Sequence, residues 1–104
     1  MKFTHEDLQV YQKSLIFLAR LQPILSSCSP RHAFVDHLHR ASESILFNLA
    51  EAVRLLRGKK QLQTMDSSIG SVFECAACLD IAHLKSLLSS AMLMENRSLL
   101  LEVC

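Results

Sequence analysis

The chain has little that would interrupt a helix. Its 104 residues include two glycines and two prolines, with no tryptophan and a single tyrosine. Few helix breakers, together with many leucine, alanine, serine and methionine residues, favour helices over β-strands. The net charge of +1 excludes a chain whose overall field attracts nucleic acid, so any such binding depends on local clusters of charge. The composition predicts an all-α protein with one domain, residues 1–104.

Long apolar runs are also missing. No segment approaches the roughly 20 consecutive apolar residues that a membrane-spanning helix needs. The N-terminal stretch MKFTHEDLQVYQKSL carries acidic side chains where a signal peptide has its apolar core. We therefore expect a cytoplasmic protein that makes no contact with a membrane. In that compartment, the four cysteines are expected to be reduced thiols.

Four amphipathic segments with short connections account for nearly the whole chain. The expected helices span about residues 4–26, 31–56, 59–84 and 90–104. Thr4 is the expected N-cap of the first helix, with Asp7 completing a capping box, and Ser89 and Ser90 are expected to cap the fourth. Pro23 removes a backbone donor, so we expect a kink or an early end there. Short connections between such helices predict an antiparallel up-down-up-down four-helix bundle.

The second helix carries the most informative pattern. Side chains spaced by alternating steps of four and three residues define one face: Phe34, Leu38, Ala41, Ile45, Asn48, Ala52 and Leu55. Asn48 is the amide on this apolar face, and a buried amide without partners costs roughly 1 to 3 kcal/mol. We therefore expect Asn48 to form a hydrogen bond with a neighbouring helix and to set the register of packing.

The remaining helices carry wide apolar surfaces. In the first helix, a strip of Val10, Phe17, Leu21 and Ile24 lies beside a stripe of Leu8, Tyr11, Leu15, Leu18 and Leu25. In the third helix, the expected core stripe is Leu62, Met65, Ile69, Val72, Ala76 and Leu79. Gly70 interrupts that helix at a cost of about 1 kcal/mol, so we expect another backbone to approach it closely. Surfaces this wide predict self-association, the alternative being a monomer with a broad core.

Candidate catalytic and metal-binding residues are few. Cys75 and Cys78 form a C-x-x-C pair, but it lies deep inside the third helix, where no helix N-terminus lowers a thiol pKa. A zinc site needs two further ligands, for which His83 with His37 or His39 are the candidates. The chain has no G-x-S-x-G elbow and no glycine-rich phosphate loop. These patterns favour cysteines that fill the core, in a non-enzymatic protein without a cofactor or a metal.

Arg54, Arg57, Lys59 and Lys60 place four cations within seven residues, at the turn between the second and third helices. In the expected bundle, this turn lies at the same end as Lys2 and His5. Cations suit a helix C-terminus, so a solvated helix end is one interpretation. The other is a site for a nucleic acid or a protein partner, in which an oligomer repeats the cluster and holds a phosphate backbone through many weak contacts.

Three strings of the sequence carry a family resemblance that spans nearly the whole chain: HEDLQVYQKSLIFLA, LHRASESILFNLAEA and SSIGSVFECAACLDIA. The pattern RAS-x-SI-x-x-N-[IL]-AE is met by Arg40, Ala41, Ser42, Ser44, Ile45, Asn48, Leu49, Ala50 and Glu51. The pattern GS-x-x-E is met by Gly70, Ser71 and Glu74. The chain thus resembles the four-helix bundle family that includes proteins encoded in intervening sequences of 23S ribosomal RNA genes and the accessory variability proteins of diversity-generating retroelements.

The resemblance also implies an oligomeric state and partners, which the residues alone do not. It implies a homopentameric ring, and the ECAACLD continuation looks most like the retroelement accessory branch, whose members bind the reverse transcriptase and its template RNA or cDNA. Accessory proteins are typically strongly basic, and the net charge of +1 here shifts the expectation toward contact with the polymerase. The alternative is an intervening-sequence-type bundle that self-assembles. Seven residues of the two patterns are the signature residues: Arg40, Ser44, Asn48, Glu51, Gly70, Ser71 and Glu74.

Overall fold

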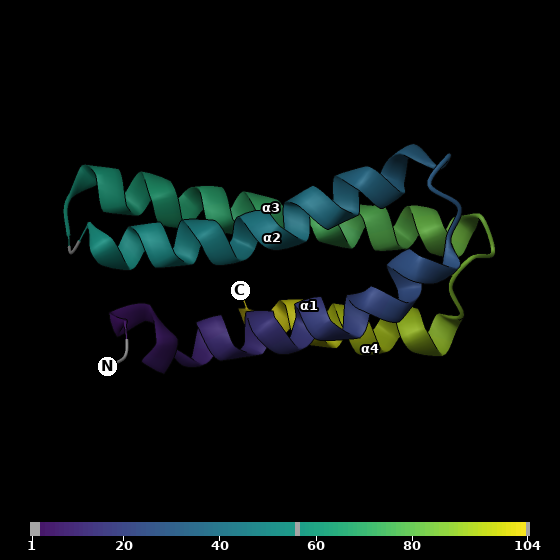
Figure 1. The fold of residues 1–104 in the computed structure, drawn as a ribbon, viewed down its shortest axis with the longest axis horizontal. Coiled ribbons are helices and arrows are strands. Elements are labelled where there is room, and N and C mark those ends of the chain that lie inside the picture. Colours follow the sequence, from purple (N-terminus) through teal and green to yellow (C-terminus); the bar gives the residue numbers. More distant parts are fainter. Residues whose placement is uncertain (1–2, 56, 104) are drawn as a thin grey trace.

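The computed structural model describes residues 3–55 and 57–103, and these residues are helical without strands (Figure 1). The elements are η1 (Thr4–Asp7), α1 (Gln9–Ser27), α2 (Ala33–Arg54), α3 (Lys59–Leu84) and α4 (Ser90–Val103). Successive α-helices run in opposite directions, with α2 beside α3 and α1 beside α4 (Figure 1). The bundle measures 42 × 24 × 21 Å. The predicted all-α four-helix architecture is confirmed.

The first helix begins differently from the prediction. Thr4 opens a short 3₁₀ helix that ends at Asp7, and no side chain caps it. Leu8 then adopts an extended conformation with φ −73° and ψ 129°, and α1 begins at Gln9. The capping box expected at Thr4 is therefore wrong, because the extended backbone at Leu8 separates the first turn from the helix proper.

The other helix boundaries fall close to the expected ones. Pro23 does not end α1, which continues to Ser27. The second helix begins at Ala33, two residues later than predicted. Ser89 caps α4 as predicted, since its Oγ accepts a hydrogen bond of 3.2 Å from the backbone N–H of Met92. Leu56 and Cys104, the expected last residues of two helices, lie outside the described residues.

The core runs between the two helix pairs. Its largest fully buried side chains come from α1, α2 and α3: Phe17, Leu21, Leu38, Ile45 and Leu79. Helix α4 adds Leu100 to this core. On α2, the predicted face is buried from Phe34 to Ile45 and again at Ala52, whereas Asn48 is half-buried. None of the described helices is both long and apolar enough to cross a membrane.

The predicted stripe of α3 is correct in its second half and wrong in its first. Leu62, Met65 and Ile69 are exposed. The buried positions are instead Ser68, Ser71, Val72, Cys75, Cys78, Leu79 and Ala82. The reason is that small hydroxyl residues turn toward α2, where Ser68 donates a hydrogen bond of 3.1 Å to the carbonyl of Ile45. The larger apolar side chains in the first half of α3 stay exposed, and α4 lies along only the C-terminal half of α3 (Figure 1).

Candidate binding surfaces

Six of the seven signature residues gather around one hollow between α2 and α3. This polar hollow has a volume of about 640 Å³, and α2 and α3 supply its whole lining. The lining residues are His37, Arg40, Ala41, Ser44, Asn48, Asp66, Ser67, Gly70, Ser71 and Glu74. Two sequence patterns about 30 residues apart therefore meet in space. Glu51 is the signature residue that does not line the hollow.

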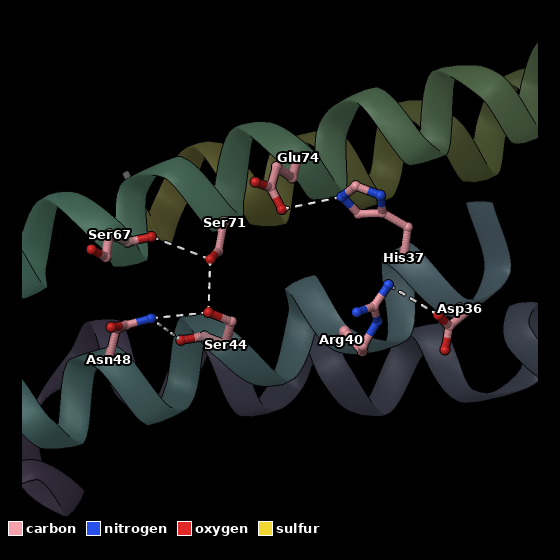
Figure 2. Close-up of polar contacts among 8 residues, drawn as sticks. All are labelled: Asp36, His37, Arg40, Ser44, Asn48, Ser67, Ser71 and Glu74. Atoms are coloured by element: carbon pink, nitrogen blue, oxygen red, sulfur yellow. Dashed lines mark hydrogen bonds and ion pairs between the residues drawn. The ribbon is translucent and has the colours of Figure 1, made fainter. Parts of the chain in front are cut away.

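A chain of hydrogen bonds crosses the floor of the polar hollow (Figure 2). The amide nitrogen of Asn48 donates to the carbonyl of Ser44 at 2.8 Å and to its Oγ at 2.9 Å. The Oγ atoms of Ser44 and Ser71 lie 2.9 Å apart, and Ser71 Oγ lies 3.2 Å from the carbonyl of Ser67. These contacts connect α2 with α3 through two hydroxyl groups.

The direction of this chain follows from counting protons. Ser71 has one hydroxyl hydrogen, so it donates either to Ser44 or to the carbonyl of Ser67. The carbonyl can only accept, and the amide nitrogen of Asn48 donates to the Oγ of Ser44. All contacts are satisfied together when Ser44 donates to Ser71 and Ser71 donates to the carbonyl of Ser67. Such a run of bonds in one direction is mutually strengthening.

Asn48 thus corrects the sequence-based expectation. It was predicted to bond a neighbouring helix, but its partner is Ser44 on the same helix, one turn earlier. The connection to α3 is indirect and passes through the hydroxyl groups of Ser44 and Ser71. A half-buried position allows this, because the amide oxygen does not have to find a partner inside the protein.

Two exposed ion pairs flank the opposite end of the hollow (Figure 2). His37 Nε2 lies 3.2 Å from Glu74 Oε2 and joins α2 to α3. Arg40 pairs with Asp36, one turn earlier on α2, at 3.1 Å. Exposed pairs of this kind contribute about 0 to 1 kcal/mol each, so they orient side chains more than they stabilise the fold.

Gly70 also departs from expectation. A Cβ atom built there would meet no atom within 4 Å, so no backbone approaches it closely. Gly70 is exposed and lines the polar hollow. Its effect in this structure is to leave that side of the hollow open.

The cysteine pair lies in the core. Cys28, Cys75 and Cys78 are free, buried thiols. Burial, with smaller effects from Cys78 and Glu74, raises the pKa of Cys75 to about 12, and burial also raises the pKa of Cys78. These thiols are poor nucleophiles, because the thiolate is the reactive form.

The candidate zinc ligands have other partners. His83 Nδ1 contacts the carbonyl of Leu88 at 2.9 Å, His37 contacts Glu74, and His39 lies 3.8 Å from Glu43. Within residues 3–55 and 57–103, no three His, Cys, Asp or Glu side chains are grouped so that they could hold a metal ion. The arrangement therefore gives Cys75 and Cys78 a place in the core and no visible chemistry.

The basic turn, defined as Arg54, Arg57, Lys59 and Lys60, is exposed throughout. Arg54 is bound to Glu51 through its Nε and Nη2 atoms, and these hydrogen bonds lower the pKa of Glu51 below its ordinary value. The other three cations form no ion pair with any described residue. Three cations therefore remain available at this turn.

The predicted neighbours of the basic turn are His5 and Lys2, and the structure describes the first of them. His5 and Arg54 line one shallow hollow, so η1 and the end of α2 are neighbours. Lys2, which was expected at the same end, lies outside the described residues. Gly58 makes the turn into α3 with φ +105°, a conformation that favours glycine.

A strip of exposed apolar side chains, the apolar strip, runs along α3 and onto α4. Its five side chains are 44–72% exposed: Leu62, Met65, Ile69, Phe73 and Leu101. Leu101 on α4 and Phe73 line a common hollow of about 350 Å³, so the strip is continuous across the two helices. An exposed apolar surface of this extent is typical of an association site.

Asn96 on α4 was not predicted as a core residue. It is 3% exposed, its amide nitrogen donates to the carbonyl of Met92 at 2.8 Å, and its Oδ1 has no hydrogen-bond partner. The spacing of Leu93, Leu100 and Val103 contains the signal, since position 96 falls on the same helix face.

Comparison with known proteins places this geometry in a family. No curated protein and no solved structure gives a significant match to the chain. The family model of the 23S rRNA-intervening sequence protein matches residues 6–104, which include all the signature residues. With that match over nearly the whole length and four helices in the structure, the chain belongs to the 23S rRNA-intervening sequence protein family.

Proposed function

We propose that the protein is a non-enzymatic, self-assembling helical subunit whose copies associate through the apolar strip. The observation that carries this proposal is the continuous exposure of large apolar side chains from Leu62 to Phe73 and at Leu101. A second copy of the chain is the proposed occupant, because it also exposes large apolar side chains outside the strip, among them Leu15, Ile16 and Phe47, against which the strip of a neighbouring copy can pack in a ring. The resemblance predicts that assembly closes into a ring of five copies.

The size of the strip sets the expected strength of association. Burying five large apolar side chains that are now 44–72% exposed contributes roughly 5 to 8 kcal/mol. Association costs about 4 to 15 kcal/mol in lost freedom of motion. One strip alone is therefore marginal, and a ring in which every copy makes two contacts is favoured over an isolated dimer. We expect assembly that depends on protein concentration.

Sedimentation velocity tests the assembly. Ile69→Glu places a charge in the middle of the strip, and we expect it to turn a concentration-dependent oligomer into a monomer with unchanged helix content. Leu84→Glu is the matched control, since Leu84 is an exposed leucine of the same helix outside the strip. A native chain that stays monomeric at 100 µM, or an Ile69→Glu variant that assembles like the native chain, would overturn the proposal.

The finer role that we propose is that of an accessory subunit of a retroelement reverse transcriptase, which binds the polymerase and its template RNA or cDNA. The likeness of the sequence to the accessory branch supports this role, and so do the three unpaired cations of the basic turn. Membership of the intervening-sequence family is equally compatible with a self-assembling bundle that has no polymerase partner. A reverse transcriptase gene with template and variable repeats beside this gene would separate the two.

A binding assay tests the basic turn directly. Replacing Arg57, Lys59 and Lys60 with glutamine should weaken binding to single-stranded RNA and lower the slope of log K against log salt by about 0.7 for each lost phosphate contact. The control removes three cations elsewhere, at Lys13, Arg31 and Lys85. Equal losses in both variants would indicate general charge attraction and would remove the basic turn from the proposal.

A further inference from the structure

We propose that the polar hollow is a binding site for a guanidinium or primary ammonium group, held at the end where Asp66 and Asn48 lie. This site is separate from the apolar strip and does not depend on it. Both residues line the hollow, together with Ser67 and Gly70.

Hydrogen-bond accounting identifies the ligand chemistry. The amide nitrogen of Asn48 donates to the carbonyl and to the Oγ of Ser44, and the hydroxyl of Ser67 donates to the carbonyl of Gln63 at 3.1 Å. The donor atoms of Asn48 and Ser67 are therefore engaged within their own helices. What remains is the amide oxygen of Asn48, which points away from Ser44 in Figure 2, the lone pairs of Ser67 Oγ and the carboxylate of Asp66. A surface that offers acceptors alone selects a ligand that offers several donors.

The charges of the lining agree with this selection. The hollow contains one arginine, Arg40, against two carboxylates, Asp66 and Glu74. Arg40 is paired with Asp36, and Glu74 is paired with His37. Asp66 forms no hydrogen bond or ion pair with any described residue. The unbalanced charge in the hollow is therefore negative, and a cation that donates hydrogen bonds to Asp66 is strongly favoured over a neutral donor.

The hollow also has the room that such a group needs. Its floor is built from small side chains, and Gly70 leaves open space where any other residue would place at least a Cβ atom. A glycine in a helix interior costs about 1 kcal/mol, and neither a positive φ nor a close neighbour explains it here. An open acceptor site at one end of the hollow does explain it.

The cation has two possible sources, a free small molecule or a side chain of a second copy. The second copy would contribute Arg57, Lys59 or Lys60, which form no ion pair with described residues of their own chain. The chemistry of the site is the same in both cases, and separate arms of the experiment distinguish them.

Titration with agmatine, which carries both cationic groups, tests the site. We expect saturable shifts of the backbone amide signals of Asn48, Ser67 and Gly70 in heteronuclear NMR spectra. Asp66→Asn should weaken agmatine binding at least fivefold, because the charge-assisted bonds are lost. Glu102→Gln removes an exposed carboxylate of α4, which contributes nothing to the hollow, and should leave binding unchanged.

A second variant tests the space without touching the charge. Gly70→Leu fills the hollow, and it should fold, since nothing lies within 4 Å of the new Cβ. We expect it to lose agmatine binding while its melting temperature rises or stays unchanged. Binding that is unaltered in Asp66→Asn, or unaltered in a folded Gly70→Leu variant, would overturn the proposal.

Sedimentation separates the two sources. If a second copy supplies the cation, then Asp66→Asn and the triple glutamine variant of the basic turn both weaken association, and agmatine competes with it. If the ligand is a free small molecule, agmatine binds and association is unchanged. Absence of agmatine binding together with unchanged association in Asp66→Asn would refute both forms. An Ile69→Glu monomer that still binds agmatine would show that the hollow works even if assembly through the strip fails.

Discussion

Ser44 and Ser71 connect the two signature patterns, because their hydroxyl groups meet between α2 and α3. Both residues are small and uncharged, so neither stands out in the sequence as a core or a binding residue. Their small side chains let the helices approach, and the same hydroxyl groups keep buried polar atoms paired. The signature thus describes a contact between two helices as much as a surface.

A double-mutant cycle measures this contact. Ser71→Ala should lower the free energy of unfolding by about 1 kcal/mol, because Ser44 loses its partner on α3. Asn48→Ala should cost a similar amount, and since both residues bond Ser44, the two effects should differ from additivity by at least about 0.5 kcal/mol. Urea unfolding monitored by circular dichroism gives all four values. Strict additivity would show that the three side chains do not form one network.

Glu51 provides a prediction about pH. The hydrogen bonds from Arg54, and the charges of Arg54 and Lys60, lower its pKa below the ordinary value of 4.5. A carboxylate whose pKa is lower in the folded state stabilises the protein above its unfolded pKa, and that contribution is lost as the pH falls through the folded pKa. We therefore expect this part of the stability to disappear below about pH 4.5. Arg54→Gln should raise the Glu51 pKa in a carboxyl NMR titration, and an unchanged value would contradict the pairing.

The two asparagines show what single positions reveal before a structure exists. Asn48 stands out in the sequence because it interrupts an apolar face, yet its partner Ser44 lies on its own helix, and its degree of burial depends on where α3 lies. Asn96 interrupts the face of α4 in the same way and is more deeply buried. Periodicity therefore locates such residues, whereas hydrogen-bond partners depend on packing that periodicity does not describe.

The chain's two glycines lie directly before α3 and in its interior, and they should respond oppositely to alanine. Gly70→Ala should raise the free energy of unfolding by about 1 kcal/mol, because the new Cβ meets nothing and helix propensity improves. Gly58→Ala should lower it by about 1 kcal/mol, because φ of +105° is strained for any residue with a Cβ atom. Thermal unfolding of the two variants gives the comparison. Destabilisation by Gly70→Ala would restore the close approach that the sequence suggested.

The stripe of α2 was largely predictable and the first half of the stripe of α3 was not, for a physical reason. On α2, apolar residues occupy the buried positions from Phe34 to Ile45, so hydrophobicity alone finds the face. On α3, Ser68 and Ser71 are buried while Leu62 and Ile69 are exposed. Burial there depends on hydrogen bonds to α2 and on how far α4 extends, and neither is encoded in the periodicity of α3.

The four-helix bundle buries Cys28, Cys75 and Cys78 in its core and leaves the apolar strip exposed. Cys75 is fully buried, so its reaction with a thiol reagent requires the helices to separate. With a pKa of about 12, only about one Cys75 thiol in ten thousand is ionised at pH 8. Cys75 therefore reports opening of the whole molecule.

Alkylation measures that opening. Treated with iodoacetamide at pH 8, the native protein should be modified at Cys75 at least a thousandfold more slowly than the unfolded chain, as followed by peptide mass spectrometry. Cys78 also lines a hollow of about 370 Å³ and should be protected less. Modification of Cys75 at the unfolded rate without denaturant would mean that the core does not stay closed.

Since the lining of the polar hollow lies entirely within residues 37–74, a single helical hairpin holds every atom that would touch a ligand. The flanking helices α1 and α4 pack against that hairpin and supply no side chain to the hollow. Substitutions on the outer faces of α1 and α4 are therefore expected to leave the proposed cation site intact. The hairpin is the part to graft when that site is wanted in another scaffold.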